Sequence, residues 1–204
     1  MSPKTKAQFE QIRSRSTSAI LQAALELFAR NGYHKTSISQ IAKEAGVSKG
    51  LIYNYFDSKE DLLTQLVMGA MSTGEEIMQT YDQTDKSPFE RLQIMVESTF
   101  SLVQSNLHYW KMIMMLSFQT EALEGFQPLI HEKNHKMQQQ MTQLFSEMGV
   151  INPEQEARLF GAIMDGVFMH YMHLEKDYPL AEMKDFILKK YRVFRKKKLE
   201  IRQD

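Results

Sequence analysis

Two helix-start signals separated by a single glycine constrain this chain most strongly, and both lie in its first third. Ser37 is followed three residues later by Gln40, which is the spacing of a capping box at the start of a helix. Gly46 ends that helix, because glycine can take the left-handed conformation that turns a chain sharply. Ser48 then caps another helix. The pattern predicts a helix, a short glycine turn and a second short helix over residues 48–54.

The second of these helices carries polar and aromatic residues on the sides that internal packing leaves free. Ile52 and Phe56 are four residues apart and are expected to pack on the preceding helix. The other side chains suit DNA, since lysine reaches phosphate or guanine, asparagine matches adenine and leucine fits a thymine methyl group. Glycine permits close approach of the backbone to DNA. For each tyrosine, packing in a small core is the alternative. This helix-turn-helix fits the major groove. The candidate DNA contacts are Thr36, Lys49, Gly50, Leu51, Tyr53, Asn54, Tyr55 and Lys59.

Helix signals continue through the rest of the chain. A further capping box opens a long helix after Asp57, and proline at the first helical position marks two more starts, at Pro88 and Pro153. The sequence shows no alternating strand pattern and no internal repeat. We therefore predict an all-α chain with a DNA-binding domain over residues 1–60 and a second helical domain over residues 61–204.

The net charge of zero hides an uneven distribution. Residues 1–60 hold nine Lys and Arg against five Asp and Glu, residues 61–183 hold seven against seventeen, and residues 184–204 hold nine against three. A basic N-terminal part on an acidic body indicates an anionic partner at one end. The absence of cysteine excludes disulfides and thiolate chemistry, and the polar N-terminus has no signal-peptide pattern. We expect a cytoplasmic protein without a membrane span.

The stretches ALELFARNGYHKT and TSISQIAKEAGVSKGLIYNYFDSKEDLL resemble the DNA-binding domain of the TetR family of bacterial transcriptional regulators. The resemblance covers residues 17–66 and adds Ser48 to the candidate contacts. It implies a homodimer of about nine helices per chain, an N-terminal domain that binds a palindromic operator, and a C-terminal domain that binds a small ligand and dimerises. Most relatives are repressors released by the ligand, and we expect no cofactor. Arg13 and Arg15, outside the motif, are placed to reach the DNA backbone or minor groove.

Methionine is frequent in this chain, with 15 residues, and it is concentrated after residue 67. Because methionine is flexible and polarisable, a lining of methionine and aromatic side chains adapts to apolar ligands of varied shape. Core packing is the alternative for any one of these side chains. We expect an apolar or aromatic effector. The candidate ligand-binding residues are Trp110, Met114, Phe118, Phe126, Met137, Met141, Met164 and Phe168.

The segment from Leu159 to Leu174 is apolar almost all the way round. Such a helix is covered on more than one side, and the last helix of the chain offers a matching apolar stripe. Together they suit a dimer interface of four helices, two from each chain, with a place in a larger monomer core as the alternative. The candidate interface residues are Gly161, Gly166, Phe186, Tyr191 and Phe194.

One motif indicates a different class of protein. The sequence HEKNH matches the pattern H-E-x-x-H, in which two histidines one helical turn apart bind zinc and the glutamate acts as general base. A zinc-dependent hydrolase using His131, Glu132 and His135 is therefore the alternative function. The pattern is short, lies in a very polar segment and has only generic candidates for a third ligand. We predict no metal site and no enzymatic activity.

Overall fold

The computed structural model describes residues 5–81 and 85–200, and within them it contains nine α-helices, two short 3-10 helices and no strand. The predicted all-α class and the expected number of helices are thereby confirmed. None of the described helices combines the length and the hydropathy needed to cross a membrane. The elements are α1 (Lys6–Asn31), α2 (Ile38–Glu44), α3 (Lys49–Tyr53), α4 (Lys59–Tyr81), α5 (Pro88–Ser105), α6 (Leu107–Ser117), η1 (Glu124–Phe126), α7 (Gln127–Glu147), α8 (Pro153–Leu174), η2 (Glu175–Asp177) and α9 (Leu180–Glu200).

The helices form two compact units. The first comprises the described residues up to Thr73 together with His108–Gly125, and the second comprises Gly74–Leu107 and the described residues from Phe126 onward. This division does not coincide with the domain boundary predicted between residues 60 and 61. The reason is that α4 continues without a break past that boundary, and that α6 is part of the first unit.

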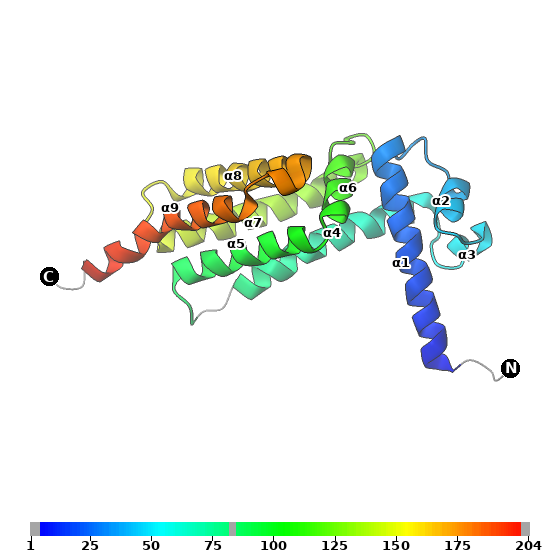
Figure 1. Ribbon diagram of the computed structural model, residues 1–204, viewed down its shortest axis with the longest axis horizontal. Helices are drawn as coiled ribbons and strands as arrows, with labels where there is room; N and C mark the ends of the chain where they lie inside the picture. The colour runs from blue at the N-terminus through cyan, green and yellow to red at the C-terminus, as the bar shows by residue number, and fades with distance from the viewer. Residues whose placement is uncertain (1–4, 82–84, 201–204) are drawn as a thin grey trace. The chain divides into compact units, whose positions relative to one another are not determined.

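In the first unit, α1 packs beside α2, and α2 beside α3 (Figure 1). A capping box between Thr5 and Gln8 starts α1, where the Gln8 amide donates to the Thr5 hydroxyl. Ile20, Ala24 and Phe28 repeat every four residues and are fully buried, which fixes the inner face of the helix. The described side chains that precede Ser16 are exposed, so the first turns of α1 extend beyond this core.

In the second unit, α7 packs along α8, and α5 along α9 (Figure 1). The turn that follows α7 contains Gly149, whose φ of 79° is a left-handed conformation that suits glycine. The rings of Phe145, Phe160 and Tyr191 pack together, with centroids 5.2–5.7 Å apart, and join α7, α8 and α9.

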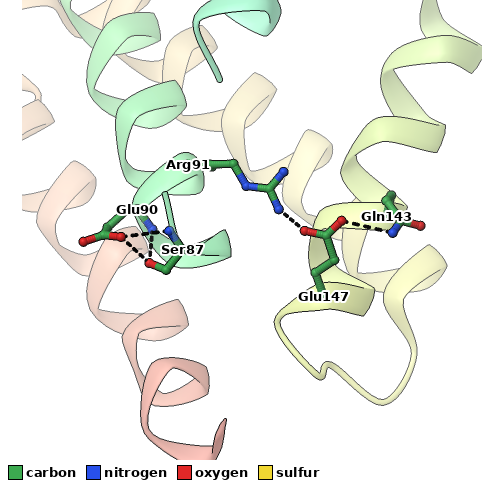
Figure 2. A network of polar contacts seen from close by, with 5 residues as sticks. All are labelled: Ser87, Glu90, Arg91, Gln143 and Glu147. Atoms are coloured by element: carbon green, nitrogen blue, oxygen red, sulfur yellow. Dashed lines mark hydrogen bonds and ion pairs between the residues drawn. The ribbon is translucent and has the colours of Figure 1, made fainter. Parts of the chain in front are cut away.

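Figure 2 shows the polar contacts at the start of α5 and their link to α7. Ser87 and Glu90 form a capping box at the helix start predicted from Pro88, with the Ser87 amide donating to a Glu90 carboxylate oxygen at 2.9 Å. The next residue, Arg91, forms an ion pair with Glu147 near the end of α7, and Gln143 donates to the same carboxylate at 3.0 Å. Because the Arg91 side chain is largely buried, this pair fixes the spacing of α5 and α7.

A buried tyrosine ties α9 to α8. The Tyr191 hydroxyl donates to the Glu156 carboxylate at 2.7 Å, and the Lys190 ammonium donates to the same oxygen at 3.1 Å. Partial burial of Glu156 opposes its ionisation, but these two hydrogen bonds hold the pKa of the carboxyl below its usual value. Burial, and then the bond to Glu156, raise the pKa of Tyr191.

Tyr191→Phe is expected to lower the free energy of unfolding at neutral pH by about 1.5–3 kcal/mol, the usual range for a hydrogen bond to a charged group. A lowered carboxyl pKa stabilises the folded state above the unfolded-state pKa, and the stabilisation is lost as the pH falls through the folded-state pKa. The difference from wild type should therefore shrink in acid. Urea denaturation at neutral and acidic pH measures it, with Tyr171→Phe on α8 as the control. A difference that is constant with pH would contradict the assignment.

Candidate DNA-binding site

Local hydrogen bonds build the helix-turn-helix as predicted. At the start of α2, the Gln40 amide donates to the Ser37 hydroxyl at 3.3 Å, and the Ser37 amide donates back to the Gln40 side chain at 2.8 Å. Gly46 has a φ of 66° and makes the turn, as glycine can without strain. The Leu51 amide then donates to the Ser48 hydroxyl at 3.1 Å and starts α3.

The inner side of this motif is apolar, and its outer side is available to a partner. Ile52 and Phe56 are buried, as predicted. On the outer side, Leu51 and Tyr55 are half-buried, and α3 ends one residue earlier than predicted, with Asn54 as its C-cap. The exposed side chains and backbone positions of this outer face belong to Ser48, Lys49, Gly50, Tyr53 and Asn54.

No packing among the residues that the structure describes explains the glycine at position 50. A Cβ atom there would meet nothing closer than the Ser48 hydroxyl oxygen at 4.0 Å, and its φ is not in the left-handed region. Alanine would favour the helix by about 1 kcal/mol over glycine. Glycine therefore leaves the outer surface of α3 without a side chain at this position, where a DNA backbone or base edge would lie.

Basic groups lie over the two tyrosines of this surface. The Lys49 ammonium lies 5.9 Å from the centre of the Tyr53 ring, and the Arg13 guanidinium lies 5.6 Å from the centre of the Tyr55 ring. Arg13 projects from the exposed first turns of α1. The ring contact thus brings a cation of α1 beside the residues that follow α3, and the sequence motif does not predict it.

The hydroxyl of Thr36 does not face outward. The side chain is 2% exposed, and its hydroxyl lies within hydrogen-bond distance of the carbonyl oxygens of Gly32, at 2.9 Å, and Leu27, at 3.2 Å. The expected phosphate contact through this hydroxyl is corrected accordingly, because a hydroxyl has one proton and these carbonyls take it. Thr36 instead closes the end of α1.

The ammonium of Lys59 is also occupied. It donates to the carbonyl oxygens of Tyr33 at 2.8 Å, Thr36 at 2.9 Å and His34 at 3.4 Å, and it lies 4.3 Å from the centre of the Tyr33 ring. Partial burial lowers the pKa of Lys59. Three acceptors account for the three N–H groups of an ammonium, so the structure assigns Lys59 to the turn before α2 rather than to a phosphate.

Sequence reasoning missed Gln119, which holds the same turn from the end of α6. Its side chain donates to the carbonyl of Phe28 at 2.7 Å and accepts from the amide of Tyr33 at 3.0 Å. These partners are 91 and 86 residues away along the chain, so no local pattern could have indicated the contact.

The predicted ligand-binding residues are divided between the two units. Trp110, Met114 and Phe118 belong to the first, where Phe118 is 72% exposed. The others belong to the second, where Met141 and Met164 are buried and Phe168 packs on Phe100 with ring centroids 4.9 Å apart. Among these, Phe126 is half-buried and Met137 is exposed. The ligand-binding set stays a prediction.

The predicted dimer residues lie in different environments. Phe186 is 66% exposed on α9, and Gly161 is exposed on α8, with Gly166 half-buried on the same helix. Tyr191 is fully buried within its own unit, so its expected place on the outer stripe is corrected. Its hydroxyl is drawn inward by the carboxylate of α8 described above. The side chain of Phe194 lies outside the described residues.

The HEKNH motif places exposed side chains on α7. His131, Glu132 and His135 are all exposed, and in the part of the chain that the structure describes no three His, Asp or Glu side chains are grouped as a metal ion would require. His170, on α8, stacks on Tyr178 with ring centroids 5.9 Å apart.

Comparisons with known proteins agree with this geometry. The family model for bacterial regulatory proteins of the tetR family matches residues 20–66. The fatty acid metabolism regulator protein of Bacillus subtilis (strain 168) is 36% identical over 105 residues, which are 52% of this chain and 54% of that protein. The chain thus spans about half the length of this relative. The HTH-type transcriptional regulator BetI of Serratia proteamaculans (strain 568) is 30% identical over 157 residues, 74% of this chain and 77% of BetI.

A solved structure shares the fold of both units. Native NalD, the secondary repressor of the MexAB-OprM multidrug efflux pump in Pseudomonas aeruginosa, aligns with a TM-score of 0.67 and 22% identity, covering 89% of this chain and 97% of NalD. The helix-turn-helix and the matches over most of the chain define a DNA-binding transcriptional regulator. The chain belongs to the TetR family. It is a regulator and not an enzyme, so the zinc hydrolase alternative is set aside.

Proposed function

We propose that this regulator is a homodimeric repressor, that it binds a palindromic operator through α3, and that a small apolar ligand releases it. The observation that carries the proposal is the outer face of α3, where Lys49, Gly50 and Asn54 are exposed. Lysine, a backbone without a side chain, and an amide that matches adenine are the groups that major-groove recognition uses. A regulator that acts on bacterial DNA in this way works in the cytoplasm.

An exposed apolar face on α8 and α9 supports the homodimer. Leu159 and Met169 of α8 and Phe186 and Val193 of α9 are each about half exposed or more. Large apolar side chains gathered on two neighbouring helices are typical of an interface. A second copy of the chain would cover them, and the resulting two-fold axis would match a palindromic operator.

The ligand class is supported by one relative and by composition. The Bacillus subtilis relative is named for fatty acid metabolism. Methionine and aromatic side chains are frequent in the part of the chain that comes after α4. They suit an acyl chain, which is apolar and flexible. We therefore propose a ligand with a long acyl chain, and we propose that the residues predicted from the sequence, Trp110 and Met114 among them, contact it.

Duplexes selected from random DNA by the purified protein test the proposal. We expect a two-fold symmetric sequence to emerge, bound with an affinity that falls about 5- to 150-fold when sodium oleate or oleoyl-coenzyme A is added, the usual range of such coupling. Fluorescence anisotropy of a labelled duplex measures the affinity, with octanoate as the short-chain control. Selection of no preferred sequence would refute operator recognition. An affinity unaffected by either long-chain compound would refute the proposed ligand.

A further inference from the structure

Side chains from two directions hold the turn at residues 32–37, which joins α1 to the helix-turn-helix. One is Gln119, which follows α6, and the other is Lys59, the first residue of α4. The hydrogen bonds that both side chains make here all end on backbone groups of this turn or of the last turn of α1. The start of α2 is therefore positioned by residues far away in sequence.

Gln119 is suited to this place by both ends of its amide. The amide nitrogen donates to the Phe28 carbonyl near the end of α1, which also accepts from the backbone amide of Gly32 at 3.0 Å. The amide oxygen accepts from Tyr33. A carboxylate of the same length could accept but not donate, and alanine could do neither. The backbone amide of Gln119 donates to the Leu116 carbonyl at 3.0 Å, which fixes the residue to the end of α6.

The other end of α6 is also attached to α1. The Nε2 atom of His108 lies 3.2 Å from a carboxylate oxygen of Glu26. Between these two attachments α6 carries Trp110 and Met114, which the proposed function assigns to the ligand, and Phe118 follows its last residue. A change in the position of α6 thus has a direct route to the end of α1 and to the turn, through hydrogen bonds.

We propose that Gln119 is a positioning residue that couples α6 to the DNA-binding helices. A ligand that binds one position of α6 more tightly than another shifts the protein toward that position. Through Gln119 the shift moves Tyr33 and the turn, and hence the start of α2. Lys59 holds the same turn from α4 and takes no part in this route. The inference rests on the proposed release by an acyl ligand.

Three variants test the coupling: Gln119→Ala, Gln119→Glu and Lys59→Ala. For each, anisotropy gives the operator affinity with and without oleoyl-coenzyme A, and the fluorescence of Trp110, the single tryptophan of the chain, reports ligand binding without DNA. We expect Gln119→Ala to bind the ligand but to change its operator affinity less than twofold on binding it. Lys59→Ala should bind the operator more weakly than wild type, but the ratio of its operator affinities without and with the ligand should equal the wild-type ratio. Gln119→Glu should lose most of the ratio, and it carries the test if Gln119→Ala does not fold.

A wild-type ratio in the Gln119 variants, with ligand bound, would overturn the inference and leave the proposed function standing. A wild-type protein that binds the ligand but keeps the same operator affinity would instead overturn the proposed release. Hydrogen exchange in the protein without ligand separates the two cases further. The Tyr33 amide should exchange at least tenfold faster in Gln119→Ala than in wild type, and equal exchange would contradict the positioning role whatever the ligand does.

Discussion

Gly50→Val should abolish operator binding while the fold is retained. Among the described residues, a Cβ atom at position 50 would meet only the Ser48 hydroxyl oxygen, at 4.0 Å, so the fold leaves room for a side chain to begin there. On the DNA side, a branched side chain would hold the backbone of α3 away from the groove. The contacts of neighbouring side chains would then be lost together, each worth about 1–3 kcal/mol where it reads a base. We expect a loss of affinity on the order of a hundredfold or more.

Gly69→Val is the matched control for this change. Gly69 lies exposed on α4, also without an atom that its Cβ would meet, so the same substitution has a similar effect on helix stability. Both variants should give the helical circular dichroism spectrum of the wild type. Operator titration by anisotropy should then separate them, with binding lost only in Gly50→Val. Full binding by the Gly50 variant would mean that α3 does not enter the groove.

Phe186→Arg should convert the proposed dimer into monomers. Covering an exposed phenylalanine stabilises an interface by about 1.5–3 kcal/mol, and two-fold symmetry makes this contribution twice. Arginine replaces it with a charge that must be removed from water or paired. The dissociation constant should rise on the order of a hundredfold or more, and operator affinity should fall with it, because one chain binds one half-site.

Sedimentation velocity at micromolar concentration measures the assembly. Ile151→Arg is the control, since Ile151 is 88% exposed in the turn between α7 and α8 and belongs to neither α8 nor α9. Gly161→Leu is a second probe, because a Cβ atom at Gly161 would meet none of the described atoms within 4 Å. A wild-type chain that sediments as a monomer, or a Phe186→Arg variant that stays dimeric, would refute the proposed interface.

The parts of the fold that depend on neighbouring residues were predictable from the sequence. Ser37 with Gln40, and Ser87 with Glu90, form the capping boxes that their spacing indicates. Such hydrogen bonds join residues three apart, so a sequence pattern contains both partners. The buried faces of α1 and α3 were predictable for the same reason. Helical periodicity places residues four apart on one side, as with Ile52 and Phe56, which are both buried.

The errors concern side chains whose partners are distant in sequence. Lys59 was expected on a phosphate, but its acceptors are carbonyls 23 to 26 residues earlier in the chain. Tyr191 was expected on an outer stripe, but its hydroxyl finds a carboxylate 35 residues away. A lysine or a tyrosine on a helix is compatible with solvent, DNA, a carbonyl or a carboxylate until the tertiary structure selects among them.

The continuity of α4 limits how this protein can be divided. A fragment that ends at residue 60 would omit Leu62 and Leu63, which are almost completely buried, and also the segment that carries Gln119. The unit that contains the helix-turn-helix is assembled from two separate stretches of chain. A chimaera that transplants this unit into a relative must therefore carry both stretches, and a single crossover point cannot exchange the whole unit without also exchanging Gly74–Leu107, which belongs to the second unit.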